Sequence, residues 1–185
     1  MRPRRSNGQR ATEDGKRLTP TLYIFAGLPG SGKSTLAQLL AAHLGAAYVR
    51  IDTIEQGLRE ICAIDVQGEG YRLAYRVAAD NLRVGMSVVA DSCNPIELTR
   101  REWERVAVDS GAKYRNIEVV CSDPREHRRR VETRQSSVPG LRLPTWRDVA
   151  EREYHDWTVD RTVVDTSGRS EGECLDELLA TMFDT

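Results

Sequence analysis

The sequence contains no long run of apolar residues. No stretch reaches the ~18 residues that a membrane-spanning helix needs, and the basic N-terminus, MRPRRSNGQR, is not followed by the apolar segment of a secretory signal. Hydrophobic residues at 39% and charged residues at 30% are typical of a soluble globular domain. We therefore expect a cytoplasmic protein without a membrane anchor.

Cysteine is scarce and scattered. Cys62, Cys93, Cys121 and Cys174 form no C-x-x-C pair, and no histidine stands at the spacing of a zinc site. This arrangement predicts free thiols in a reducing compartment rather than a disulfide framework. Internal repeats are also missing, and a chain of 185 residues is long enough for one domain with a proper core.

Charge is unevenly distributed along the chain. Residues 1–17 contain six basic and two acidic residues, whereas the whole chain carries a net charge of -1, so the remainder is acidic. A basic tail can contact nucleic acid, but this one lacks aromatic residues and apolar periodicity. We predict a disordered tail over residues 1–19 and one domain over residues 20–185.

From residue 20 onward, apolar runs typical of strands alternate with segments of helical periodicity. The expected strands are 21–27, 46–52, 87–91, 116–122 and 161–166. The expected helices are 33–45, a mostly helical stretch to about 84 with a break at 65–70, and then 95–111, 124–134, 146–157 and 172–182. This alternation predicts a five-stranded parallel sheet between two helical layers, an α/β/α fold.

The segment GLPGSGKST matches the phosphate-binding pattern G-x-x-x-x-G-K-[ST]. It consists of Gly27, Leu28, Pro29, Gly30, Ser31, Gly32, Lys33, Ser34 and Thr35. Glycines allow the backbone N–H groups to surround a phosphate, and the following helix presents its positive end to the anion. Lys33 is expected to reach the β- and γ-phosphates, and Ser34 to offer its hydroxyl to Mg²⁺. The pattern predicts a P-loop that binds a nucleotide.

A P-loop is common to GTPases, motor ATPases and kinases. The segment 65–68, DVQG, matches the D-x-x-G of a GTPase switch, but the guanine-reading N-K-x-D is missing from the chain. Asp52 and Asp91 end the second and third expected strands, and ligands of open α/β sheets bind at those carboxyl ends. Both carboxylates are therefore expected to face the phosphates, although each could instead cap the helix that follows it.

Together, GLPGSGKST, RID, VVADSCNP and CSDPREHRRRVETR resemble the small P-loop kinases related to bacteriophage polynucleotide kinase, chloramphenicol phosphotransferase and the zeta toxins. The resemblance covers roughly residues 20–182. It implies that Asp52 is the general base for the acceptor hydroxyl and that Asp91 lies near the phosphates or the metal, so that Ser34 and Asp91 are the candidate Mg²⁺ ligands. It does not identify the acceptor, because members of the group phosphorylate very different molecules.

The segment EHRRRVETR predicts a helix whose charges are partly paired. Glu126 precedes Arg130 by four residues and Arg128 precedes Glu132 by four, whereas no acidic residue stands at that spacing before Arg134. Asp123 is expected to cap this helix, with Glu126 completing a capping box. Repulsion between Arg130 and Arg134 on one helix face would cost only ~0.5 kcal/mol, so removing either arginine is not expected to destabilise the protein.

The resemblance also implies that R-x-x-x-R ends the helix after the fourth strand and leads into a helical lid. Arg130 would then cover the nucleotide and Arg134 would clamp the transferring phosphoryl group. The alternative is a solvated basic face, and the sequence does not decide which of Arg128, Arg130, Arg134 and Arg142 contacts the phosphates.

We therefore predict a kinase that uses ATP and Mg²⁺ to phosphorylate a hydroxyl of a small acceptor such as a nucleotide or sugar. One alternative is a nucleotide-binding regulatory ATPase without such an acceptor. The other is a kinase of nucleic-acid 5′ ends, which the acidic domain and its lack of an aromatic stacking platform disfavour. Tyr71, Arg72, Tyr75 and Arg76 share a helical face that could line the acceptor pocket or be an ordinary core-and-surface face.

Overall fold

The computed structural model describes residues 19–183, so the predicted basic tail lies outside the described residues except for Thr19. The elements in chain order are β1 (Thr21–Ala26), α1 (Lys33–Leu44), β2 (Ala47–Arg50), α2 (Ile51–Cys62), α3 (Glu69–Arg83), β3 (Val88–Asp91), α4 (Glu97–Asp109), β4 (Lys113–Val120), α5 (Pro124–Thr133), α6 (Trp146–Ala150), β5 (Thr162–Asp165) and α7 (Glu171–Phe183).

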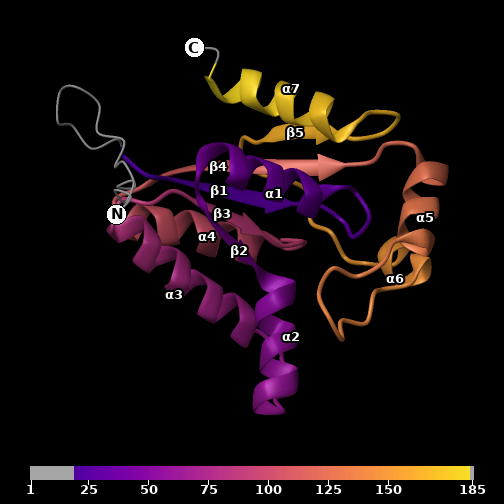
Figure 1. The fold of residues 1–185 in the computed structure, drawn as a ribbon, viewed down its shortest axis with the longest axis horizontal. Helices are drawn as coiled ribbons and strands as arrows, with labels where there is room; N and C mark the ends of the chain where they lie inside the picture. Colours follow the sequence, from indigo (N-terminus) through magenta and orange to yellow (C-terminus); the bar gives the residue numbers. More distant parts are fainter. Residues whose placement is uncertain (1–18, 184–185) are drawn as a thin grey trace, which may run out of the picture.

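The five strands form one sheet in the order β2-β3-β1-β4-β5, and all neighbouring strands are parallel. The strands therefore end at a common edge, where the loop after β1, the helices α5 and α6 and the start of α2 gather (Figure 1). The register places Asp91, the last residue of β3, opposite Phe25 of β1 and Arg50 of β2. This register brings the two predicted strand-end regions to the phosphate-binding loop.

Helices cover both faces of the sheet and complete the predicted three layers (Figure 1). On one face, α1 and α7 pack through residues such as Leu40 and Leu178 against Phe25. On the other face, α3 and α4 pack through Leu82 and Trp103 against strand residues such as Ile24. Successive residues of a strand point to opposite faces, which is why Ile24 and Phe25 belong to different clusters.

Two predicted boundaries are wrong near the site. The second strand ends at Arg50 and α2 begins at Ile51, so Asp52 lies in the first turn of a helix rather than at the end of a strand. The helix predicted over 146–157 ends at Ala150. Beyond it, the backbone carbonyls of His155 and Asp156 accept hydrogen bonds from Arg100, so tertiary contacts replace the helical ones.

All four cysteines are free thiols, and Cys121 and Cys174 are buried. No helix within residues 19–183 is long and apolar enough to cross a membrane.

Candidate functional site

The loop between β1 and α1 has the backbone that its glycines predict. Gly27, Gly30 and Gly32 have φ values of 139°, 87° and 91°, a region that residues with a Cβ rarely adopt. A Cβ on Gly27 would lie 2.2 Å from the carbonyl oxygen of Val119, and one on Gly30 would lie 2.5 Å from Cγ2 of Val131. These two glycines allow the loop to approach β4 and α5 closely.

The loop is braced from three sides. The Gly27 N–H donates to the carbonyl of Cys93 at 3.1 Å, and the Thr166 hydroxyl donates to the carbonyl of Ser31 at 2.8 Å. Nε2 of His127 lies 2.9 Å from the carbonyl oxygen of Pro29. The phosphate-binding backbone is therefore shaped before any nucleotide arrives.

Lys33 and Asp91 form a buried ion pair in the floor of the site. Nζ of Lys33 lies 2.6 Å from Oδ1 of Asp91, and their side chains are 7% and 1% exposed. The Tyr48 hydroxyl donates to the other carboxylate oxygen at 2.6 Å. Burial by itself lowers the pKa of Lys33, but the charge and hydrogen bond of Asp91, together with the nearby Cys93 and Asp52, outweigh it and the pKa of Lys33 is raised. Burial likewise raises the pKa of Asp91, but Lys33 and the hydroxyls of Tyr48 and Ser34 lower it below its usual value.

Ser34 and Asp91 suit a magnesium ion that is bound together with a nucleotide. The Ser34 hydroxyl lies 3.4 Å from Nζ of Lys33 and so beside the Asp91 carboxylate. Within residues 19–183, no group of three or more His, Cys, Asp or Glu side chains could hold a metal. Mg²⁺ commonly uses one or two protein ligands and completes its shell with phosphate oxygens and water, which is the donor set available here.

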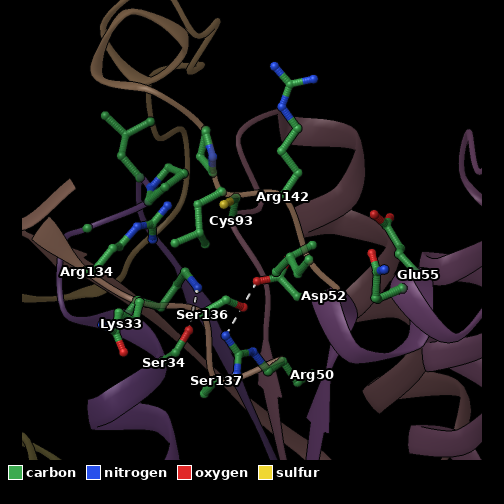
Figure 2. Close-up of a pocket in the computed structure, with 18 of the residues that line it drawn as sticks. Lys33, Ser34, Arg50, Asp52, Glu55, Cys93, Arg134, Ser136, Ser137 and Arg142 are labelled. Atoms are coloured by element: carbon green, nitrogen blue, oxygen red, sulfur yellow. Dashed lines mark hydrogen bonds and ion pairs between the residues drawn. The ribbon is translucent and has the colours of Figure 1, made fainter. Parts of the chain in front are cut away.

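An open cleft of about 1060 Å³ lies above this floor. Lys33 and Ser34 stand on one side of it, and Asp52 and Glu55 of α2 stand on the other (Figure 2). The basic residues in its walls are Lys33, Arg50, Arg59, Arg130, Arg134, Arg142 and Arg152, and the acidic ones are Asp52, Glu55 and Asp148. The structure therefore brings the predicted P-loop, Asp52, Arg130 and Arg134 to one cavity.

Neither aspartate serves as the helix cap that the alternative interpretation required. Arg50 is the N-cap residue of α2, and Ile96 is that of α4. The Asp52 side chain is 47% exposed and opens to the cleft, whereas Asp91 is buried beneath it. The two carboxylates therefore have different surroundings and can have different roles.

Arg50 was not among the residues singled out from the sequence. Its guanidinium lies 3.7 Å from the carboxylate oxygens of both Asp52 and Asp91, and it donates to the hydroxyl of Ser137 at 2.7 Å (Figure 2). It thus connects α2, β3 and the loop that follows α5. Its place two residues before the expected strand-end Asp52 was the available signal, but an arginine there is also ordinary on a solvated strand end.

Arg130 is held by partners on two elements. It donates to Glu126 at 2.7 Å and to the hydroxyl and carbonyl of Thr166 at 2.7 and 2.9 Å. Asp123 caps α5 as predicted, but the Glu126 side chain accepts from the N–H of Gly168, so the expected capping box does not form. Arg130 therefore joins α5 to the loop after β5, and these hydrogen bonds lead us to expect a loss of stability on its removal, in place of the unchanged stability predicted from the sequence.

Arg134 is the C-cap of α5 and has an extended backbone, with φ of -65° and ψ of 149°. It therefore does not share a helical face with Arg130 as predicted, although both residues line the cleft. Arg134 is partly buried, its Nε atom has no hydrogen-bond partner, and no ion pair involves it within residues 19–183. Burial lowers the pKa of Arg134, with Cys93, Asp52 and Arg50 as its charged or ionisable neighbours.

The other candidate residues divide clearly. Arg128 is exposed and paired with Glu132 at 2.8 Å, outside the cleft, whereas Arg142 lines it. None of the four residues proposed for the acceptor pocket on α3 lines the cleft. Tyr71 and Tyr75 pack against the core and Trp103, and Arg72 and Arg76 are exposed, so the core-and-surface interpretation was correct.

A second cavity, of about 650 Å³, adjoins the first on the side of α7. Its walls include Thr35, Arg130, Thr166, Arg169 and Cys174. Arg130 and Thr35 line both cavities, so the two spaces meet at the start of α1.

Comparison with known proteins assigns the fold. A family model described as an AAA domain matches residues 22–153, most of the chain. The chain belongs to this AAA domain family. The match includes the P-loop, Asp52, Asp91, Arg130 and Arg134. A search of curated protein sequences found no match.

Solved structures of small P-loop proteins have the same fold. The APS kinase CysC of Mycobacterium tuberculosis, in complex with AMPPNP and APS, superposes with a TM-score of 0.67 at 20% identity, covering 89% of this chain and 98% of that one. A gluconokinase from Sinorhizobium meliloti 1021 superposes with a TM-score of 0.61 at 19% identity, covering 89% of this chain and 92% of that one. Kti12 of Chaetomium thermophilum in complex with ADP-AlF3 superposes with a TM-score of 0.63 at 19% identity, covering 85% of this chain and 97% of that one. These likenesses confirm the predicted fold, and the narrower resemblance to the polynucleotide kinase group stays a prediction.

The buried ion pair predicts different effects for the two aspartates. Asp91→Asn leaves the Lys33 ammonium buried without a counter-charge, so the free energy of unfolding should fall by about 3–5 kcal/mol. Asp52→Asn, at an exposed carboxylate, should change it by less than about 0.5 kcal/mol. Urea denaturation of the nucleotide-free proteins at pH 7 measures both. Equal effects of the two substitutions would contradict the assignment of the pair.

The same pair predicts a pH window. The folded pKa of Asp91 is lowered, so its contribution is present above the unfolded value and is lost as the pH falls through the folded one. The folded pKa of Lys33 is raised, so its contribution is present below the unfolded value and is lost as the pH rises through the folded one. In Asp91→Asn the buried Lys33 ammonium has no counter-charge and can lose its proton, so the stability difference from wild type should be largest near about pH 5 and shrink toward both acid and alkaline pH. A difference that stays the same from about pH 3 to about pH 10 would refute the pairing.

Proposed function

We propose that this protein is a kinase that transfers the γ-phosphoryl group of ATP to a hydroxyl of a small molecule. The observation that carries the proposal is the position of Asp52. Its carboxylate faces the P-loop across an open cleft that is large enough for an acceptor (Figure 2). A phosphate cradle opposite an accessible carboxylate is the arrangement that general-base activation of a hydroxyl requires.

The P-loop side of the cleft binds the triphosphate. Backbone N–H groups of residues 27–35 and the start of α1 attract the phosphates. Lys33 supplies a counter-charge when the phosphates compete with Asp91 for the Lys33 ammonium. Mg²⁺ held by Ser34 and Asp91 would neutralise part of the phosphate charge. The chain's own contribution is to position the phosphates.

The second cavity suits the nucleotide base. It adjoins the P-loop, and its walls combine the apolar side chain of Leu36 with the guanidinium of Arg130. A planar guanidinium can stack on a base, and Thr166 fixes the orientation of this one. Arg130 therefore serves the nucleotide rather than the transferred group.

Transfer takes place between the two sides of the first cavity. The acceptor oxygen forms a bond to the γ-phosphorus, the bond to the β–γ bridging oxygen breaks, and the hydroxyl proton passes to Asp52. Arg134 and Arg50 flank Asp52, and each has a buried Nε atom without a hydrogen-bond partner. Two such donors can stabilise the charge that develops on the phosphoryl oxygens.

Two other functions fit the same P-loop. A regulatory ATPase would hydrolyse ATP without needing the open space beside Asp52. A kinase of nucleic-acid ends would need a path for a strand, which the basic tail outside the described residues could support. The size of the cleft favours a small acceptor, and cytoplasmic location stays a prediction.

Two substitutions test the reaction. Lys33→Ala should weaken ATP binding and abolish transfer, because a phosphate counter-charge is lost. Asp52→Asn should leave ATP binding intact and lower transfer by about 10²–10⁴-fold, because an amide cannot accept the proton. ADP release over a panel of hydroxyl compounds measures transfer, and calorimetry with an ATP analogue measures binding. Basal ATPase that no acceptor stimulates and that Asp52→Asn leaves unchanged would indicate the regulatory ATPase instead.

Substitutions of Arg130 and Arg134 should have different effects on kcat and on KM for ATP. Arg134→Ala should lower kcat by about 10²-fold with little change in KM for ATP, because its contact strengthens in the transition state, and Arg134→Lys should rescue it poorly. Arg130→Ala should mainly raise KM for ATP and lower the free energy of unfolding by about 1–3 kcal/mol, because its hydrogen bonds to Glu126 and Thr166 are lost.

Arg128→Ala is the matched control on α5, because Arg128 is exposed and lies outside the cleft. It should leave kcat and KM for ATP unchanged and alter the free energy of unfolding by no more than about 0.5 kcal/mol. If Arg134→Ala lowered stability but left turnover normal, Arg134 would be a structural residue.

A further inference from the structure

The cleft carries more positive charge than the nucleotide needs. Seven basic and three acidic side chains line it, an excess of four, or three when Asp91 in the floor is counted. The whole chain has a net charge of -1, so this excess is local. ATP with its magnesium ion carries about two negative charges at neutral pH. One or two positive charges in the cleft are therefore left for another ligand.

The surplus can be traced to particular arginines. Four basic residues of the cleft form an ion pair or a side-chain hydrogen bond: Lys33, Arg50, Arg59 and Arg130. Within residues 19–183, the side chains of the other three, Arg134, Arg142 and Arg152, form neither. Arg134 is accounted for by the phosphoryl group, which leaves Arg142 and Arg152.

Arg152 lines the cleft and lies within electrostatic reach of the Cys93 thiol. It follows α6 and lines the cleft close to Cys93, whose carbonyl is bonded to the P-loop. Burial raises the pKa of the Cys93 thiol, whereas the positive charges of Lys33 and Arg152 act in the opposite direction. Arg142 also lines the cleft, but its guanidinium points away from Lys33 and Asp52 (Figure 2). Arg152 is therefore the better placed of the two to hold a molecule against Asp52.

We propose that the phosphoryl acceptor is itself an anion, a hydroxyl compound that carries a phosphate, sulfate or carboxylate group, and that Arg152 binds this group. The inference rests on the proposed kinase function and adds the chemical class of the acceptor. A guanidinium recognises an oxyanion through paired N–H donors. Held in this way, the acceptor keeps its hydroxyl beside Asp52, and a neutral polyol lacks the charge that the surplus arginines attract.

Paired acceptors test the charge of the substrate. Glycerol is compared with glycerate and glycerol 3-phosphate, glucose with gluconate and glucose 6-phosphate, and nucleosides with their monophosphates and sulfate esters, all at constant ionic strength with Mg·ATP. An anionic member should exceed its neutral partner in kcat/KM by about 10-fold or more, and its identity separates carboxylate, phosphate and sulfate. Equal or better use of the neutral members would overturn the inference and leave the kinase function standing.

A matched pair of variants tests the residue. Arg152→Gln should raise KM for the anionic acceptor by about 10–100-fold and leave KM for ATP unchanged. Arg147→Gln is the control, because Arg147 lies on α6 outside the cleft and is paired with Glu151, and it should behave as wild type. Equal KM values for the acceptor in the two variants would contradict the role of Arg152.

Binding of inorganic anions gives a readout that does not depend on turnover. With the P-loop saturated by Mg·AMPPNP, phosphate or sulfate should raise the Tm of wild type and Arg147→Gln, but not that of Arg152→Gln. No difference among the three proteins would overturn the anion site. Stabilisation of wild type without transfer to any acceptor would instead mean that the anion site exists and the kinase function is wrong.

Discussion

Lys33 and Asp91 form an ion pair that joins the start of α1 to the end of β3, and the geometry of the site depends on it. Both side chains are almost completely removed from water, where an isolated charge would be very costly. Each therefore fixes the other. The pair also sets the P-loop lysine beside the Ser34 hydroxyl, so the groups that meet the phosphates are in place before the nucleotide binds.

Around this pair, the parallel sheet concentrates the chemistry at one edge. The strands end together, so segments that are distant in sequence contribute neighbouring side chains to a single cleft. The bracing of the P-loop by Cys93, Thr166 and His127 keeps one wall rigid. The opposite wall consists of α2 and the loop after α5, which Arg50 connects through Ser137. The braced P-loop therefore faces the wall beside which we propose that the acceptor binds.

Local sequence patterns predict the parts of this structure that local physics determines. The order of strands and helices and the P-loop follow from apolar periodicity and from glycines that adopt positive φ. The end of α6 and the role of Arg50 do not, because both depend on tertiary partners such as the carbonyls that Arg100 binds. The sequence also predicts wrongly that Arg130 and Arg134 share one helix face. The helix α5 ends one residue before Arg134, whose extended backbone takes its side chain off that face.

The most direct test of the account follows the γ-phosphate itself. ATP labelled at that position is incubated with the full-length protein, Mg²⁺ and a small-molecule extract, and the labelled products are separated by charge and identified by mass. The account predicts that the label appears in a phosphate ester of a compound that was already anionic. Label found entirely in inorganic phosphate, at a rate that the extract does not change, would contradict it.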